Sequence, residues 1–119
     1  MADFKVLYRD GEGVSVIDLK GYLDAHTAPD LENAFQKLLN DRKFNIVVNC
    51  KELTYISSAG LGVFMAFIED VRKNKGDIKF SNMSPKVYNV FDLLGVLLLY
   101  EIFKDEPEAV VRFRAQSKP

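Results

Sequence analysis

Residues Leu53–Phe64, with the sequence LTYISSAGLGVF, decide the fold and contain the most informative side chains of the chain. Two serines, Ser57 and Ser58, stand where an extended segment ends and an amphipathic helix begins. Such a junction presents free backbone N–H groups and the positive end of a helix dipole, so it tolerates or attracts negative charge. A hydroxyl at this place is either a helix cap or a phosphoacceptor. If the hydroxyl is only a cap, the chain is a plain small domain. If it is a phosphoacceptor, the chain is a switch controlled by phosphorylation.

The segments on either side of the serines have the patterns of a buried strand and of a packed helix. Phe44–Asn49 is a short apolar run with β-branched residues, typical of a central strand covered on both faces. After the serines, apolar residues recur at helical spacing and predict one buried helix face, made of Leu61, Phe64, Met65, Ile68 and Val71. Lys73–Gly76 ends this helix with cations and a glycine, as the negative end of its dipole prefers.

The first residues predict a hairpin. Phe4–Tyr8 and Val14–Lys20 are the expected strands, joined by a turn at Asp10–Gly13 whose glycines supply the positive φ that such turns need. The apolar alternation of the second strand changes phase near Val16 and Ile17. This change indicates either a bulge or burial on both faces of the strand.

A helix is predicted to begin at Thr27. Thr27 can cap it, Pro29 suits its first turn, and Asp30 lies three residues on as a variant of the capping box. Its apolar residues fall on one face, which consists of Leu31, Ala34, Phe35, Leu38 and Leu39.

The C-terminal part predicts two more strands and two more helices. In chain order they are a strand at Ile78–Ser81, a helix from Ser84 to Gly95, a strand at Tyr100–Phe103 and a helix from Asp105 to about Arg114. The first of these helices is expected to face the core with Val87, Val90, Phe91 and Leu94. Pro85 and Pro107 suit the first turns of the two helices, and Leu97–Leu99 are expected to be buried with the final strand.

The resulting element order is β-β-α-β-α-β-α-β-α. Strands that alternate with helices imply an α/β fold, with a mixed, largely parallel sheet of about five strands and about four helices packed on it. At 119 residues the chain is long enough for one domain and too short for two comfortable ones. We therefore expect a single domain over residues 1–119.

The composition excludes several classes of partner. A net charge of −1, with scattered Lys and Arg, gives no reason to expect nucleic acid or an acidic membrane. Cys50 is the only cysteine, so an internal disulfide is impossible and a reducing compartment fits. Met1–Lys5 lacks the apolar run of a signal peptide, and the longest apolar stretch, at Val96–Leu99, is far too short to span a membrane. These features predict a cytoplasmic protein, a monomer or a weak dimer.

Three segments resemble a known family, the STAS domain, and within it the small bacterial anti-sigma factor antagonists. The resemblance covers nearly the whole chain. It rests on the element order and on three motifs, Gly21–Asp24, Ile56–Gly62 and Ser84–Gly95. The resemblance implies a STAS-type fold. It also implies a partner that is both an anti-sigma factor and a serine kinase, and a phosphatase that reverses the modification.

The resemblance assigns the phosphoacceptor to Ser58, the serine that follows an aspartate in the family's commonest form. Here Ser57 stands in place of that aspartate, so Ser57 remains the second candidate for modification. In such proteins the unphosphorylated form binds the kinase and frees the sigma factor. From the residues alone, Ser57 is the better candidate for the helix cap.

Five other residues are candidates for the surface that binds the partner. Asp24 ends a strand, where the loops of open α/β sheets converge, and by resemblance it lies near the phosphoserine site. Gly60 and Gly62 permit close approach of another backbone, or else allow the helix start to pack tightly on the sheet. Val63 and Phe67 lie beside the main apolar face of their helix. They are covered by the third helix or form part of an exposed patch.

Three more side chains are interpreted as structural. His26 is the only histidine and lacks partners for a metal or catalytic site, so it is expected to be a loop residue. Cys50 is expected in the core, and Tyr55 at the edge of the serine site.

The leading hypothesis is an anti-sigma factor antagonist that sequesters its kinase while Ser58 is unmodified. The alternative is a constitutive STAS scaffold subunit of a transport or signalling complex that is not phosphorylated. An enzyme has little support, because no nucleophile–base pair, paired carboxylates or metal cluster can be assembled. No cofactor and no metal are expected.

Overall fold

The computed structural model describes residues 4–117, so most of the stretch Met1–Lys5, which was expected to lack a signal peptide, lies outside the described residues. The elements are β1 (Phe4–Gly11), β2 (Val14–Leu23), α1 (Ala28–Asn40), β3 (Asn45–Ile56), α2 (Ser58–Lys73), β4 (Asp77–Ser81), α3 (Pro85–Leu93), the 3-10 helix η1 (Leu97–Leu99), β5 (Ile102–Phe103) and α4 (Glu106–Ser117). The strands form one sheet in the order β1-β2-β3-β4-β5. Only β1 and β2 are antiparallel, and the other pairs are parallel. The predicted α/β fold and element order are confirmed.

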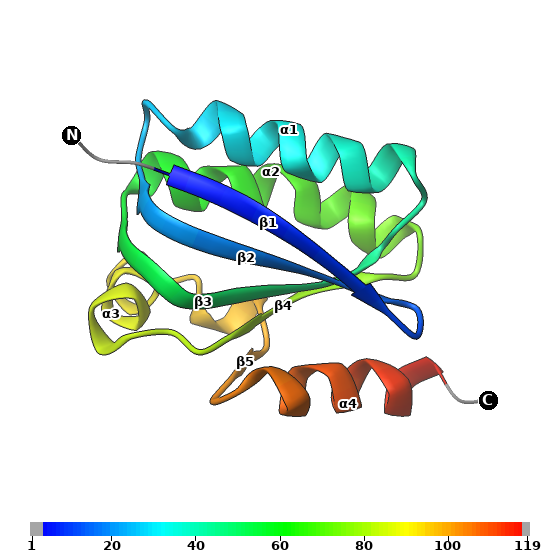
Figure 1. The fold of residues 1–119 in the computed structure, drawn as a ribbon. Coiled ribbons are helices and arrows are strands. Elements are labelled where there is room, and N and C mark those ends of the chain that lie inside the picture. Colours follow the sequence, from blue (N-terminus) through cyan, green and yellow to red (C-terminus); the bar gives the residue numbers. More distant parts are fainter. Residues whose placement is uncertain (1–3, 118–119) are drawn as a thin grey trace.

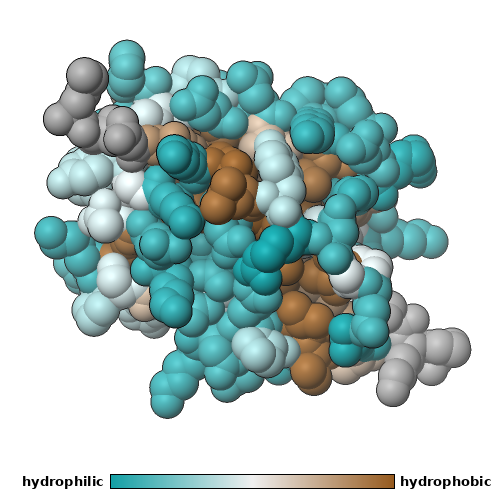
Figure 2. All heavy atoms as spheres, in the orientation of Figure 1, coloured by the Kyte–Doolittle hydropathy of each residue, from teal (hydrophilic) through white to brown (hydrophobic). Residues whose placement is uncertain are grey.

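The helices cover the two faces of the sheet unequally. Figure 1 shows α1 and α2 side by side on one face and α4 alone on the other. The larger core lies under α1 and α2 and includes Val87 and Phe91 of α3. A smaller core under α4 consists of Val14, Val16, Val47, Ala109 and Phe113. Figure 2 shows a mostly hydrophilic face, with hydrophobic residues gathered over the middle of the sheet and next to α4.

The sequence of strand β2 indicated either a bulge or burial on both faces, and the structure shows both. Val16 contributes to the core under α4 and Ile17 to the larger core, so the strand is buried on both faces. Its pairing with β3 also shifts register between Asp18 and Lys20. In the preceding turn Gly13 has a positive φ of 82°, but the other positive φ belongs to Glu12 and not to Gly11.

The start of α1 differs from the prediction in how it is capped. The Thr27 side chain makes no capping hydrogen bond, because its Oγ1 donates to the Tyr22 carbonyl oxygen at 2.7 Å. Asp24 closes the turn that leads into α1, since its Oδ1 accepts from the backbone N–H groups of His26 at 2.9 Å and Thr27 at 3.1 Å. The expected proline in the first turn is confirmed.

The central strand is longer than predicted, and the helix after it buries a different set of residues. β3 runs on to Ile56, so Cys50 lies within the strand, where it is buried as expected. In α2, Met65 is 45% exposed and the prediction that it faces the core is wrong. Val63 is buried in its place, because helix α1 covers that side of α2.

The segment after α3 corrects two further expectations. Leu94 is 47% exposed, and in η1 Leu98 is 99% and Leu99 42% exposed, so the prediction that these three leucines are buried is wrong. The final strand is reduced to β5, and the leucines before it form a 3-10 turn. Gly95 was predicted to end this helix; it has a φ of 72° and directly follows Leu94, the C-cap of α3.

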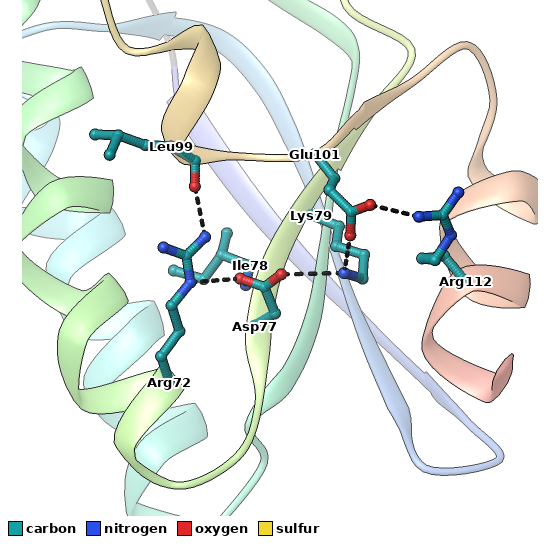
Figure 3. A network of polar contacts seen from close by, with 7 residues as sticks. All are labelled: Arg72, Asp77, Ile78, Lys79, Leu99, Glu101 and Arg112. Carbon is teal, nitrogen blue, oxygen red and sulfur yellow. Dashed lines mark hydrogen bonds and ion pairs between the residues drawn. The ribbon is translucent and has the colours of Figure 1, made fainter. Parts of the chain in front are cut away.

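A chain of charged side chains ties α4 and the segment before β5 to the rest of the fold (Figure 3). Lys79 of β4 is fully buried and pairs with Asp77 at 3.0 Å and with Glu101. Arg72 of α2 binds Asp77 at 3.0 Å, and Arg112 of α4 binds Glu101 at 2.7 Å. The Lys79 ammonium also lies 4.6 Å from the centre of the Phe113 ring. Each charge of this network therefore has an opposite partner.

Candidate functional site

Ser57 occupies the position between β3 and α2 and acts as the helix cap. Its backbone is extended, with φ −101° and ψ 172°, and its Oγ accepts a hydrogen bond from the Gly60 N–H at 3.3 Å. Its own N–H donates to the Leu23 carbonyl oxygen at 2.9 Å, which holds the end of β2 against the junction. The interpretation of Ser57 as the cap is confirmed, and its hydroxyl oxygen is already engaged.

Ser58 differs from its neighbour in every relevant respect. It is the first residue of α2 and is exposed. Within residues 4–117, its hydroxyl has no hydrogen-bond partner. The first turn of α2 contains no acidic residue, so no fixed negative charge competes at the positive end of this helix. An anionic group on Ser58 would therefore meet a favourable field and open solvent.

The two glycines of the junction serve different purposes. A Cβ at Gly60 would lie 2.6 Å from Leu23 Cγ and 3.0 Å from the Leu23 carbonyl oxygen. Gly60 is therefore required for the helix start to pack on β2, which is the packing role considered from the sequence. Gly62 is exposed, and a Cβ there would meet no atom within 4 Å. Packing inside the described chain does not explain Gly62.

The loop between β2 and α1 lies next to the junction and is internally rigid. Leu23 precedes Asp24 and accepts the Ser57 N–H, so Asp24 begins a loop that starts beside the serines. The Asp24 carboxylate closes the turn before α1, and the Asp24 backbone N–H donates to Thr27 Oγ1 at 2.9 Å. His26 is an exposed loop residue, as expected. The carboxylate of Asp24 thus has a structural role beside any contact with a partner.

An exposed pair of tyrosines borders the same end of the sheet. Tyr22 and Tyr55 are paired in register on β2 and β3, and their ring centres lie 5.6 Å apart. They are 46% and 41% exposed. Tyr55 lies at the edge of the site as expected, whereas Tyr22 was not anticipated. The available signal was an aromatic residue directly before the last residue of each strand.

Val63 and Phe67 do not form an exposed surface. Val63 is only 4% exposed, and Phe67 is half-buried and stacks on Phe35 of α1 with ring centres 5.3 Å apart. Of the two possibilities left open by the sequence, the exposed patch is wrong. The helix that covers Phe67 is α1 and not the third helix, because α1 packs beside α2 and places Phe35 against the Phe67 ring.

The described residues offer no site of another kind at the junction. No group of three or more metal-ligating side chains occurs among residues 4–117. None of the helices in this part of the chain is long and apolar enough to cross a membrane. Burial raises the pKa of the Cys50 thiol to about 12, so this cysteine is not a reactive nucleophile.

Comparisons with known proteins agree with this architecture. The STAS domain model matches residues 6–109. The anti-sigma F factor antagonist of Paenibacillus polymyxa is 26% identical over 106 residues, which span 88% of this chain and 91% of that protein. The crystal structure of an anti-sigma factor antagonist from Mycobacterium paratuberculosis is 25% identical, with a TM-score of 0.86 over 94% of this chain and 95% of that chain.

A further structure resembles the chain in fold. It is that of the Bacillus cell fate determinant SpoIIAA in its phosphorylated form, 23% identical, with a TM-score of 0.70 over 94% of this chain and 100% of that chain. Since the STAS model spans most of the chain and solved structures share its fold almost end to end, this chain belongs to the STAS domain family.

Proposed function

We propose that the chain is a cytoplasmic anti-sigma factor antagonist that works as a phosphorylation-controlled binding switch. In its unphosphorylated form it binds an anti-sigma factor that is also a serine kinase. The kinase modifies Ser58 and a serine phosphatase reverses the change. The observation that carries the proposal is the exposed, unpartnered hydroxyl of Ser58 at the N-terminus of α2. Relatives named as anti-sigma factor antagonists support it.

The choice of Ser58 over Ser57 follows from their hydrogen bonds. The Ser57 oxygen accepts the Gly60 N–H, so its modification would compete with the helix cap. Ser58 can accept a phosphate without breaking any hydrogen bond of its side chain within residues 4–117. A structural neighbour of this fold, SpoIIAA, has itself been solved in a phosphorylated form.

The physics of the site favours a switch that acts on the partner and leaves the fold intact. A phosphate adds about −1.5 to −2 charges at neutral pH, and the N-terminus of α2 stabilises such a charge. A partner that packs closely around a small hydroxyl would have to desolvate this charge. Unless it presents an arginine there, it loses affinity.

The partner would contact the surface around Ser58. A protein–protein interface of ordinary size buries about 800 Å² on each side. An interface of this size centred on Ser58 would include the Asp24 loop, exposed Gly62 and the pair Tyr22–Tyr55. Tyrosines are common anchors of interfaces. Gly60 contributes by positioning the helix start. Val63 and Phe67 are not proposed as contacts, because α1 and the core cover them.

The experiment is a binding assay with the purified anti-sigma factor kinase of the same host, read by calorimetry. Ser58→Asp is expected to lower the affinity by at least about 100-fold, because the carboxylate must be desolvated in the contact. Ser57→Ala is the matched control. It is expected to lower stability by about 1 kcal/mol through the lost cap while binding stays within a few-fold.

Mass spectrometry then locates the modification. Incubation with the kinase and ATP should place one phosphate on the peptide containing Ser58, and Ser58→Ala should abolish it. A phosphate on Ser57 would overturn the assignment of the site. If the kinase binds Ser58→Asp as tightly as the unmodified chain, the switch is wrong. Co-purification with a transport complex and an unmodified peptide would then favour the constitutive scaffold.

A further inference from the structure

An open cavity of about 460 Å³ lies at the end of the sheet opposite to the serine junction. It is lined by three turns, at residues 10–15 between β1 and β2, 42–45 between α1 and β3, and 74–75 between α2 and β4. Figure 1 shows the ends of α1 and α2 and the β1–β2 turn gathered at one end of the molecule. Strand β3 begins beside this cavity and ends at Ile56, next to Ser57, so its whole length separates the two places. The volume is that of a small-molecule site, for which about 300–1,000 Å³ is usual.

Two neighbouring helices end at this cavity on a cation with left-handed backbone. Arg42 follows the C-cap of α1 with a φ of 57°, and Lys75 follows the C-cap of α2 with a φ of 66°. Glycine is the usual residue at such a position, because a side chain there is strained. The helix dipole favours a cation anywhere in the last turn, so it does not require one at the strained position. Of the four non-glycine residues with positive φ within residues 4–117, three line this cavity, the third being Glu12.

The turns that carry these two cations are held against each other. The Asp77 N–H donates to the Phe44 carbonyl oxygen at 2.9 Å. Gly76 packs so closely on the same carbonyl group that a Cβ at this position would overlap it. The Arg42 guanidinium lies over the Phe44 ring, 5.7 Å from its centre. Backbone packing therefore brings Arg42 and Lys75 to one cavity.

The carboxylates of the cavity are neutralised, whereas its two left-handed cations are not. Asp10 binds Lys43 at 2.5 Å, and Glu12 pairs with Arg114 of α4. The two left-handed cations make no ion pair within residues 4–117. A phosphate monoester carries about −1.5 to −2 charges at neutral pH, which matches two unpaired cations. A guanidinium also binds phosphate oxygens through two parallel hydrogen bonds.

Two asparagines of the cavity have amide oxygens that are available to a ligand. Asn45 Nδ2 donates to the Gly13 carbonyl oxygen at 3.3 Å, and Asn74 Nδ2 donates to the Asp70 carbonyl oxygen at 2.9 Å. Within residues 4–117, neither Oδ1 atom accepts a hydrogen bond. These oxygens are acceptors, so they suit the hydroxyl groups of a polar ligand.

We propose that this cavity binds a sugar phosphate. Arg42 and Lys75 bind the phosphate, and the amide oxygens of Asn45 and Asn74 accept hydrogen bonds from the sugar hydroxyls. The site goes beyond the proposed binding switch and does not depend on Ser58, which lies at the other end of β3. A failure of the switch therefore leaves it standing.

Calorimetry with glucose 6-phosphate tests the chemistry of the ligand. A Kd of about 100 µM is expected. Glucose should bind at least about 100-fold more weakly because it lacks the phosphate, and inorganic phosphate at least about tenfold more weakly because it lacks the hydroxyls. Equal affinities for glucose 6-phosphate and inorganic phosphate would overturn the sugar-phosphate assignment. No binding of glucose 6-phosphate up to about 10 mM would overturn the site.

Glycine substitutions test the two cations without strain. Arg42→Gly and Lys75→Gly suit the left-handed backbone, so both variants are expected to fold, which circular dichroism checks. Each should weaken the binding of glucose 6-phosphate at least about tenfold. Lys86→Gln is the matched control, because Lys86 is an exposed cation on α3, beyond the other end of β4. Its Kd should stay within about twofold of that of the unmodified chain. Unchanged binding by both glycine variants would overturn the proposal.

Backbone NMR separates this cavity from the start of α2, which also attracts anions. Glucose 6-phosphate should shift the amide signals of residues 42–45 and 74–76 and leave those of residues 57–62 in place. Shifts confined to residues 57–62 would overturn the proposal and assign the phosphate to the N-terminus of α2. Ser58→Asp should bind the sugar phosphate with an unchanged Kd, so the switch and this site are tested separately.

Discussion

Adjacent residues at the start of α2 have different roles because one position separates the cap from the first helical turn. Ser57 has extended backbone and its oxygen points back to the Gly60 N–H. Ser58 begins the helix, and its side chain points outward. Farther along the same turn, Gly60 faces Leu23, and Gly62, two positions on, faces solvent. A partner that approached α2 would therefore meet Ser58 and Gly62.

This difference predicts opposite effects for two alanine substitutions. Gly60→Ala should lower the free energy of unfolding by about 1–3 kcal/mol, because its Cβ would overlap Leu23 Cγ and crowd the Leu23 carbonyl. Gly62→Ala should raise it by about 0.5–1 kcal/mol, since alanine is the better helix former and the space is open. Urea unfolding measures both. A loss of stability for Gly62→Ala would contradict the geometry.

Among the elements, α4 is held by the smaller apolar core and also by polar contacts to strands far from it in sequence. Arg9 of β1 binds Asp18 at 2.7 Å and Glu106 of α4 at 2.5 Å, and Asn49 of β3 donates to Glu106 at 2.9 Å. The hydrogen bond from Arg9 lowers the pKa of Glu106, and partial burial opposes this only in part. The helix dipole also favours a carboxylate in the first turn of α4.

The attachment of α4 should therefore depend on pH. The pKa of Glu106 in the folded chain lies below its unfolded value of about 4.3, so its contribution is complete above pH 5 and is lost as the pH falls through the folded value. Glu106→Gln should cost about 1 kcal/mol at pH 7. The difference from the unmodified chain should shrink below about pH 4.

Urea unfolding at several pH values measures this effect, with Glu108→Gln as the control. Glu108 lies in the same turn and is exposed, and it makes no ion pair among the described residues. Its substitution should change stability by less than about 0.5 kcal/mol. An equal loss for Glu106→Gln at pH 3 and pH 7 would show that charge is not the cause.

At the scale of the whole molecule, a row of alternating charges joins parts that the sheet alone does not connect. It runs from Arg72 at the end of α2 through Asp77, Lys79 and Glu101 to Arg112 on α4 (Figure 3). Lys79 lies at its centre and is fully buried. Removal of its ammonium would still leave each carboxylate with an arginine. The buried charge is therefore the dispensable part, and the buried hydrocarbon stem is not.

Two substitutions of Lys79 separate charge from packing. Lys79→Met keeps a similar volume beneath Phe113 and should change the free energy of unfolding by less than about 1 kcal/mol. Lys79→Ala opens a cavity between β4 and α4 and should cost about 2–4 kcal/mol. Chemical denaturation with urea compares the two. Equal, large losses would mean that the ammonium itself holds the network together.

The sequence predicted most of the elements, because their signals are local. Ser84 caps the start of α3 and Gly95 follows the end of that helix, as the sequence indicated. Ser57 caps α2. Of the candidate site, the sequence predicted the two serines at the start of α2. The errors occur where the outcome depends on a distant neighbour. Thr27 was expected to cap α1, but the Tyr22 carbonyl on β2 takes its hydroxyl.

The sequence by itself determined the alternation of strands and helices and the position of two serines at a helix start. These features follow from hydrophobic periodicity and capping residues, which depend only on residues a few positions apart. Only the tertiary structure decided which sides of those elements are exposed. Val63 is buried and Leu98 is fully exposed, although both are equally apolar. Hydrophobicity favours burial for every apolar residue, but the area available for burial is set by the packing of neighbouring elements. Helix α1 covers one side of α2, whereas within residues 4–117 nothing covers the Leu98 side chain of η1.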